Sequence, residues 1–180
     1  MPGTPDPVLG SQILTHAFAS AVGLVLVGVA YVYRERIARD RLLPAVVGVG
    51  YATATLAVWA AARVVTDAMR DTGFTENLLA TAGILVFSFL LLAGFVYGTA
   101  RLYARYGLVV PLIGLFGVTE LVWWAFLHVR GESDALGMFV FFGPMFVAIV
   151  LLVTGIEYVA RRVWAGRGQK KRREITGESR

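Results

Sequence analysis

One carboxylate inside an apolar stretch of the sequence is the first candidate for chemistry. Glu120 lies within the 22 residues Leu108 to Val129, LVVPLIGLFGVTELVWWAFLHV, where it is the single acidic residue. At about 1.5 Å rise per residue, a helix over this stretch puts Glu120 roughly 18 Å from Leu108, at or just past the middle. An ionisable group at that depth in a bilayer is costly, so we expect it to mark a functional site.

Two interpretations of Glu120 follow from its chemistry. It could handle a proton or a cation in a small carrier or channel, or it could be a protonated acid that donates one hydrogen bond between helices. A helix turns about 100° per residue, which puts Gly117 and Trp124 within about 60° of Glu120 around the axis. A small residue such as Gly117 lets a neighbouring helix approach closely. We therefore expect Glu120 at the edge of a helix-packing face.

The two histidines are the next candidates. His16 lies near the start of the first apolar run, and His128 closes the run that contains Glu120. Facing histidines could ligate the iron of a b-type haem, since imidazole is a common axial ligand. Interfacial hydrogen bonding is the preferred interpretation for both, because haem-binding histidines are expected deeper in a span. A relay from His128 to Glu120 is geometrically loose, since the two are about 80° apart around the helix.

Two further charged residues near span ends are interpreted as structural. Glu157 precedes Arg161 by four residues, which is the favourable order for an ion pair on a helix. Arg63 precedes Asp67 by four residues, and its long side chain can reach the lipid headgroups. Ser133 and Asp134 are candidate caps for the helix that follows them.

The elements that position these residues are helices in a membrane. Charged residues make up 16% of the chain and hydrophobic residues 57%, whereas soluble domains carry about 25% charged residues. The apolar runs are too long for barrel strands, and a bilayer requires every backbone group to be paired within a helix or a closed barrel. We predict an all-α bundle within residues 1–164, with five spans near 13–33, 42–65, 77–97, 108–129 and 136–159.

The positive charges predict the orientation of this bundle. Fourteen of the seventeen Lys and Arg residues fall on one side of a five-span arrangement, which places the C-terminus in the cytoplasm and the N-terminus outside. Residues 165–180 form a basic tail that is too polar to fold alone and is expected to be disordered. Its cations are expected to contact anionic lipid headgroups rather than nucleic acid: Arg167, Lys170, Lys171, Arg172 and Arg173.

Several absences guide the functional interpretation. The sequence contains no cysteine, and both lysines lie in the tail. It has no phosphate-binding loop, no HExxH and no GxSxG, so we expect no enzyme activity, no metal and no cofactor. The leading hypothesis is a multi-pass protein of the cell membrane, a small subunit or accessory factor that packs with itself or with partners through Gly and Ala faces. The proton or cation carrier and the b-haem electron carrier are the alternatives.

Overall fold

The computed structural model describes residues 6–68, 77–129 and 134–175, with side chains as far as residue 164. These residues form helices joined by short connections, plus one small antiparallel ribbon. In chain order the elements are β1 Asp6–Pro7, α1 Gln12–Val32, α2 Arg34–Arg39, α3 Leu42–Val65, α4 Leu78–Tyr106, α5 Val110–Phe126, β2 His128–Val129 and α6 Ala135–Ile175.

The predicted all-helical fold is confirmed. Helices α1, α3 and α4, together with α6 as far as Trp164, are long and apolar enough to cross a membrane. Helix α5 is also apolar but has only 17 residues, or about 26 Å of helix. Only 22–33% of the residues in the apolar part of each of these four helices are buried within the described chain, a pattern that favours lipid as their surroundings.

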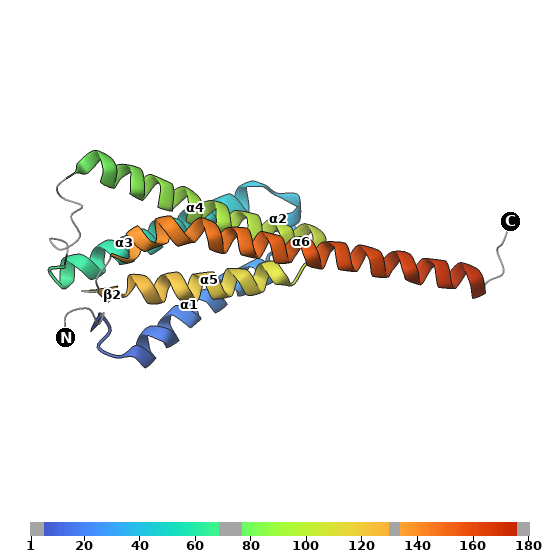
Figure 1. Ribbon diagram of the computed structural model, residues 1–180, viewed down its shortest axis with the longest axis horizontal. Coiled ribbons are helices and arrows are strands. Elements are labelled where there is room, and N and C mark those ends of the chain that lie inside the picture. The colour runs from blue at the N-terminus through green and yellow to red at the C-terminus, as the bar shows by residue number, and fades with distance from the viewer. Residues whose placement is uncertain (1–5, 69–76, 130–133, 176–180) are drawn as a thin grey trace.

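The long helices run alternately in opposite directions along the bundle (Figure 1). Helices α1, α4 and α6 point toward the end that carries α2, whereas α3 and α5 point toward the end that carries β2. Strand β1 pairs with β2 through the register Asp6–Val129 and Pro7–His128, so the N-terminal lead is attached to the end of α5. We call the end of the bundle that carries β1 and β2 the ribbon end, and the opposite end the α2 end.

Close helix contacts depend on a few glycines whose missing side chain admits a neighbour. A Cβ on Gly48 of α3 would lie 2.6 Å from the backbone oxygen of Ala93 on α4, so these backbones pack as closely as glycine allows. Gly114 of α5 similarly faces Val150 of α6. By contrast, the GxxxG glycines Gly94 and Gly98 of α4 have no atoms against them within the described chain.

The end of the third predicted span and both ends of the fourth differ from the predicted boundaries. Helix α4, which contains the third predicted span, does not end near residue 97 but continues to Tyr106, where Gly107 with φ 67° forms a left-handed cap. Helix α5 begins two residues later than predicted and ends at Phe126, where the chain becomes extended and joins the ribbon. A ribbon of two residues per strand is too short to leave a pattern in the sequence.

Helix α6 extends far beyond the predicted end of the last span. It runs from Ala135 to Ile175, so residues 165–175 are helical where we expected a disordered tail. Extending an existing helix avoids the cost of nucleation, and arginine, lysine, glutamine and glutamate are good helix formers. The side chains of Arg167, Lys170, Lys171, Arg172 and Arg173 lie outside the described part of the chain, so their contacts with headgroups stay a prediction.

Candidate functional site

His16 and Glu120 form a hydrogen-bonded pair between α1 and α5. The Nδ1 atom of His16 lies 2.9 Å from Oε1 of Glu120, although 104 residues separate them in the sequence. The His16 side chain is 55% exposed and that of Glu120 is 29% exposed. This polar pair therefore lies on the flank of the bundle, at the seam between two helices, and can be reached from the side.

The depth of Glu120 differs somewhat from the predicted one. Glu120 is ten residues from Val110, where α5 begins, and six from Phe126, where it ends. These separations correspond to about 15 Å and 9 Å along the helix, so the carboxylate lies closer to the ribbon end. His16 lies in the second turn of α1 at the same end. The pair is therefore one to two helical turns inside the bundle.

Trp124 of α5 and His128 of β2 lie beside the polar pair, on its ribbon-end side. The Trp124 ring stacks on His16 at 5.8 Å between centroids and contacts His128 at 4.4 Å. His128 Nδ1 lies 2.6 Å from the backbone oxygen of Trp124, and its Nε2 lies 3.2 Å from the side-chain oxygen of Gln12. Two residues of α1, Gln12 and His16, thus lie together with Glu120, Trp124 and His128 from α5 and β2.

This geometry bears on the two expected roles of the histidines, hydrogen bonding and haem ligation. Both ring nitrogens of His128 have partners, and one nitrogen of His16 is bonded to Glu120. The indole of Trp124 contacts both imidazoles. The two rings therefore do not face one another across an open space of the kind that a haem requires. Hydrogen bonding near the ribbon end fits both residues, and Glu120 pairs with His16 rather than with His128.

A second polar cluster at the ribbon end is buried and was predicted only in part. The Nε atom of Arg63 on α3 lies 2.6 Å from Oδ2 of Asp134, and its side chain is 2% exposed. Arg63 also donates to the backbone oxygen of Phe126 at 2.9 Å, and the Trp59 indole donates to Asp134 at 3.1 Å. Arg63, Asp134 and the Trp59 indole thus each have hydrogen-bond partners in this cluster, and such pairing lowers the cost of burying charge.

The partner of Arg63 corrects the local interpretation of the sequence. Arg63 pairs with Asp134, 71 residues away, rather than with Asp67, and it is buried rather than extended toward the headgroups. Asp134 also accepts from the backbone nitrogen of Leu136 at 2.7 Å, so its predicted role as a cap of the last helix is confirmed. The other candidate cap, Ser133, lies outside the described residues.

Glu157 has a structural position at the α2 end. Its two carboxylate oxygens accept hydrogen bonds from the backbone nitrogens of Val109 and Val110, at 3.0 and 2.9 Å. The predicted pair with Arg161 is confirmed at 2.6 Å, and Arg161 also donates to the backbone oxygen of Gly107 at 3.0 Å. A carboxylate of α6 therefore caps the start of α5, where backbone N–H groups lack partners within the helix.

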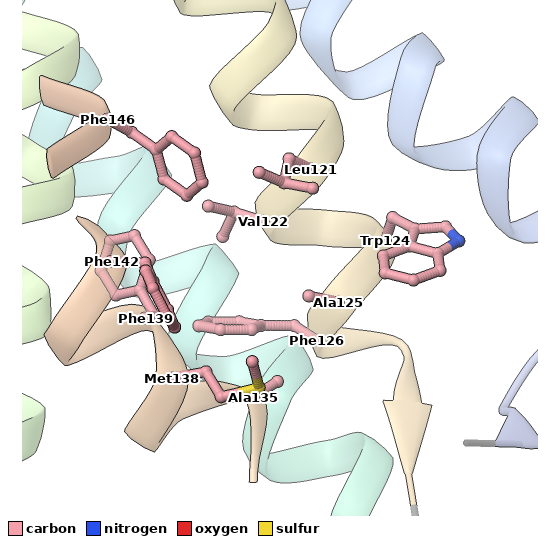
Figure 2. Close-up of a pocket in the computed structure, with 10 residues that line it drawn as sticks. All are labelled: Leu121, Val122, Trp124, Ala125, Phe126, Ala135, Met138, Phe139, Phe142 and Phe146. Atoms are coloured by element: carbon pink, nitrogen blue, oxygen red, sulfur yellow. The ribbon is translucent and has the colours of Figure 1, made fainter. Parts of the chain in front are cut away.

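An apolar cavity of about 220 Å³ lies between α5 and α6 near the ribbon end. Figure 2 shows Phe139, Phe142 and Phe146 of α6 on one side and Val122 and Phe126 of α5 on the other. In the same view the Trp124 ring extends away from these phenylalanines, toward α1. A lining without ionisable groups cannot support acid–base chemistry, so the cavity adds no catalytic candidate.

Comparison of the chain with protein-family models, curated proteins and solved structures gave no match.

Proposed function

We propose that the chain is a non-enzymatic, multi-pass protein of the cell membrane, a small subunit or accessory factor whose α1–α5 flank binds a helix of a partner membrane protein. The observation that carries this proposal is the His16–Glu120 pair, which is polar, satisfied by one hydrogen bond and exposed on the side of an apolar bundle. Ionisable groups within the membrane normally face protein or water, so a partner is expected to cover this pair.

A five-span arrangement with the N-terminus outside and the C-terminus in the cytoplasm is part of the proposal. Contacts at both ends of α5 support five crossings. Its start is capped by Glu157 at the α2 end, and the chain that follows it pairs with Asp6 and Pro7 at the ribbon end. The excess of Lys and Arg at the α2 end and beyond supports the orientation.

The surface around the polar pair supports a helical partner. Gly117 lies one turn before Glu120 on α5, and a Cβ built there would meet no atom within 4 Å. Ile113 precedes it by one turn and is 65% exposed. An open glycine beside a polar side chain is the combination through which helices associate in lipid, by close backbone approach and an interhelical hydrogen bond. The proposed partner therefore presents a polar side chain toward Glu120.

A photo-crosslinking amino acid at Gly117 tests this interface in native membranes. We expect a cross-linked product larger than this chain by the mass of one specific membrane protein. A crosslinker at Leu152, which is 65% exposed on α6, is the matched control and should not give this product. Introducing Glu120→Gln beside the crosslinker should weaken the product several-fold, because the carboxylate is the group that the partner recognises.

Two results would contradict the proposal. Equal products from positions 117 and 152 would indicate non-specific neighbours in the membrane. A product with the mass of two copies of this chain would indicate self-association instead of an accessory role. Mass spectrometry of the excised product separates these cases from a specific partner.

A small proton carrier is the second candidate, and the 2.9 Å contact of an imidazole with a carboxylate favours it. Such a pair can exchange a proton. Against this candidate, the described chain has no acidic, basic or histidine side chain along the helices between this pair and the groups at the α2 end. Purified protein in liposomes should show proton flux that Glu120→Gln abolishes, and unchanged flux in that variant would end this candidate.

A further inference from the structure

The α2 end carries a second open site, far from the His16–Glu120 pair. A surface cavity of about 660 Å³ lies where α1 meets α2, and its lining includes Arg34, Arg36, Tyr31, Tyr33 and Tyr103. The lining combines two guanidinium groups with three phenol rings. Tyrosine rings are typical of the membrane–water interface, and arginine supplies planar donors suited to phosphate oxygens.

Arg34 lies against the end of α4 and its Gly107 cap. Its guanidinium carbon lies 5.3 Å from the ring centroid of Tyr103 on α4, and the Tyr103 side chain beneath it is buried. One of its terminal nitrogens lies 3.1 Å from the position that a Cβ on Gly107 would occupy. A cation–π contact leaves the N–H groups at the edge of the guanidinium plane free to bind an anion. Arg34 is therefore positioned before any ligand arrives.

The positive charge of this cavity is not balanced by the protein. Among the side chains that the structure describes, no carboxylate lies within ion-pair distance of Arg34 or Arg36. Glu35 also lines the cavity, but its carboxylate is oriented toward Arg39, at 3.9 Å, and is 88% exposed. This contrasts with Arg63 and Arg161, each of which has an acidic partner. The cavity therefore keeps a net positive charge.

We infer that this cavity binds a phosphate group, with Arg34 and Arg36 as charge-assisted donors and the tyrosine hydroxyls as additional donors. Arginine binds phosphate through paired, parallel N–H bonds, which are among the strongest hydrogen bonds in proteins. Tyr31 and Val32 are 68% and 72% exposed beside the cavity, which gives it an apolar rim at the last turn of a span. An anionic phospholipid at the membrane surface matches both features, because its phosphate is negatively charged and its acyl chains are apolar. Free phosphate carries the same negatively charged oxygens.

Lipid titration of the delipidated full-length protein tests this inference by native mass spectrometry. Phosphatidylglycerol should bind with one saturable site, whereas diacylglycerol of the same chain length, which lacks the phosphate, should not. Arg34→Gln should weaken phosphatidylglycerol binding about tenfold or more, as loss of one charge-assisted contact implies. Arg105→Gln removes an exposed charge at the same end of the bundle, outside the lining, and should change binding little.

The controls separate the site from its alternatives. If Arg34→Gln disturbs folding, Arg36→Gln provides the same test from an exposed position and should also weaken binding. Displacement of the lipid by millimolar inorganic phosphate would support the phosphate site and assign it to a soluble ligand. Equal binding of phosphatidylglycerol to all variants, or equal binding of diacylglycerol, would overturn the inference. Neither result would affect the partner interface at the opposite end.

Discussion

Two polar contacts at the ribbon end differ in how completely the fold satisfies them. Arg63 and Asp134 lie 2.6 Å apart in the interior, and further hydrogen bonds engage each of them. His16 and Glu120 lie 2.9 Å apart on the flank, where the two side chains are 55% and 29% exposed. The first contact joins the ends of α3, α5 and α6, whereas the second joins only α1 and α5.

The difference separates polar groups that stabilise the fold from polar groups that remain accessible on its surface. A buried ion pair whose members lose a partner is strongly destabilising, so the Arg63–Asp134 contact is tied to stability. An exposed pair contributes little to stability, so the His16–Glu120 contact needs another reason to occupy an apolar surface. The proposed binding of a partner would provide that reason. Variants of the buried contact and of the exposed contact should therefore differ in their effect on stability.

The largest expected effect is that of Asp134→Ala. This change leaves the buried Arg63 without its carboxylate and should lower the free energy of unfolding by about 3–5 kcal/mol. Asp40→Ala is the matched control, because Asp40 accepts from the nitrogen of Leu42 at 2.8 Å in the same way but is exposed. Asp40→Ala should lower the free energy of unfolding by only about 1 kcal/mol, the usual effect of losing a helix cap. Denaturant unfolding in detergent measures both, and equal losses would contradict the comparison.

The next effect concerns packed and open glycines. Gly48→Ala would place a Cβ 2.6 Å from the backbone of Ala93, so α3 and α4 must separate slightly. We expect this to lower the free energy of unfolding by about 1–3 kcal/mol. Gly117→Ala on α5 meets no atom within 4 Å and should leave stability unchanged or raise it by up to about 1 kcal/mol. Thermal unfolding of the two variants distinguishes them. Destabilisation by Gly117→Ala alone would indicate that the proposed partner face is packed after all.

Glu157→Ala tests a carboxylate at the α2 end whose hydrogen-bond partners come from the fold itself. The change removes the acceptors of the Val109 and Val110 nitrogens and the partner of Arg161. We expect a loss of about 1–2 kcal/mol, similar to the loss of a helix cap, with earlier hydrogen exchange in the first turn of α5. Hydrogen-exchange mass spectrometry measures this locally. Uniform destabilisation without local exchange at the start of α5 would contradict the capping role.

The sequence was a good guide to what depends on local patterns. Apolar run length predicted the helical fold, and the four-residue spacing of Glu157 and Arg161 predicted their contact. Asp134 was predicted as a cap because caps depend on the residue next to a helix. Helices α4 and α6 extend beyond their predicted ends, because residues with high helix propensity continue a helix past its apolar part.

Contacts between distant helices could not be predicted in the same way. Arg63 was assigned to the nearby Asp67, although its partner Asp134 belongs to a different helix. The His16–Glu120 contact was not predicted, since a single sequence does not say which faces of α1 and α5 meet. Periodicity gives the side of a helix on which a residue lies, but not the helix that packs against that side.

The smallest expected effect on stability is that of Glu120→Gln. This variant tests the exposed contact directly, because it should affect the proposed partner binding but not the fold. Gln keeps the shape and can still hydrogen-bond His16, and the pair is exposed, so the free energy of unfolding should change by less than about 1 kcal/mol. The same change should nevertheless reduce crosslinking from position 117 several-fold. A stability loss as large as that of Asp134→Ala would place Glu120 among the groups that the fold itself requires, and the argument for a partner at this face would fail.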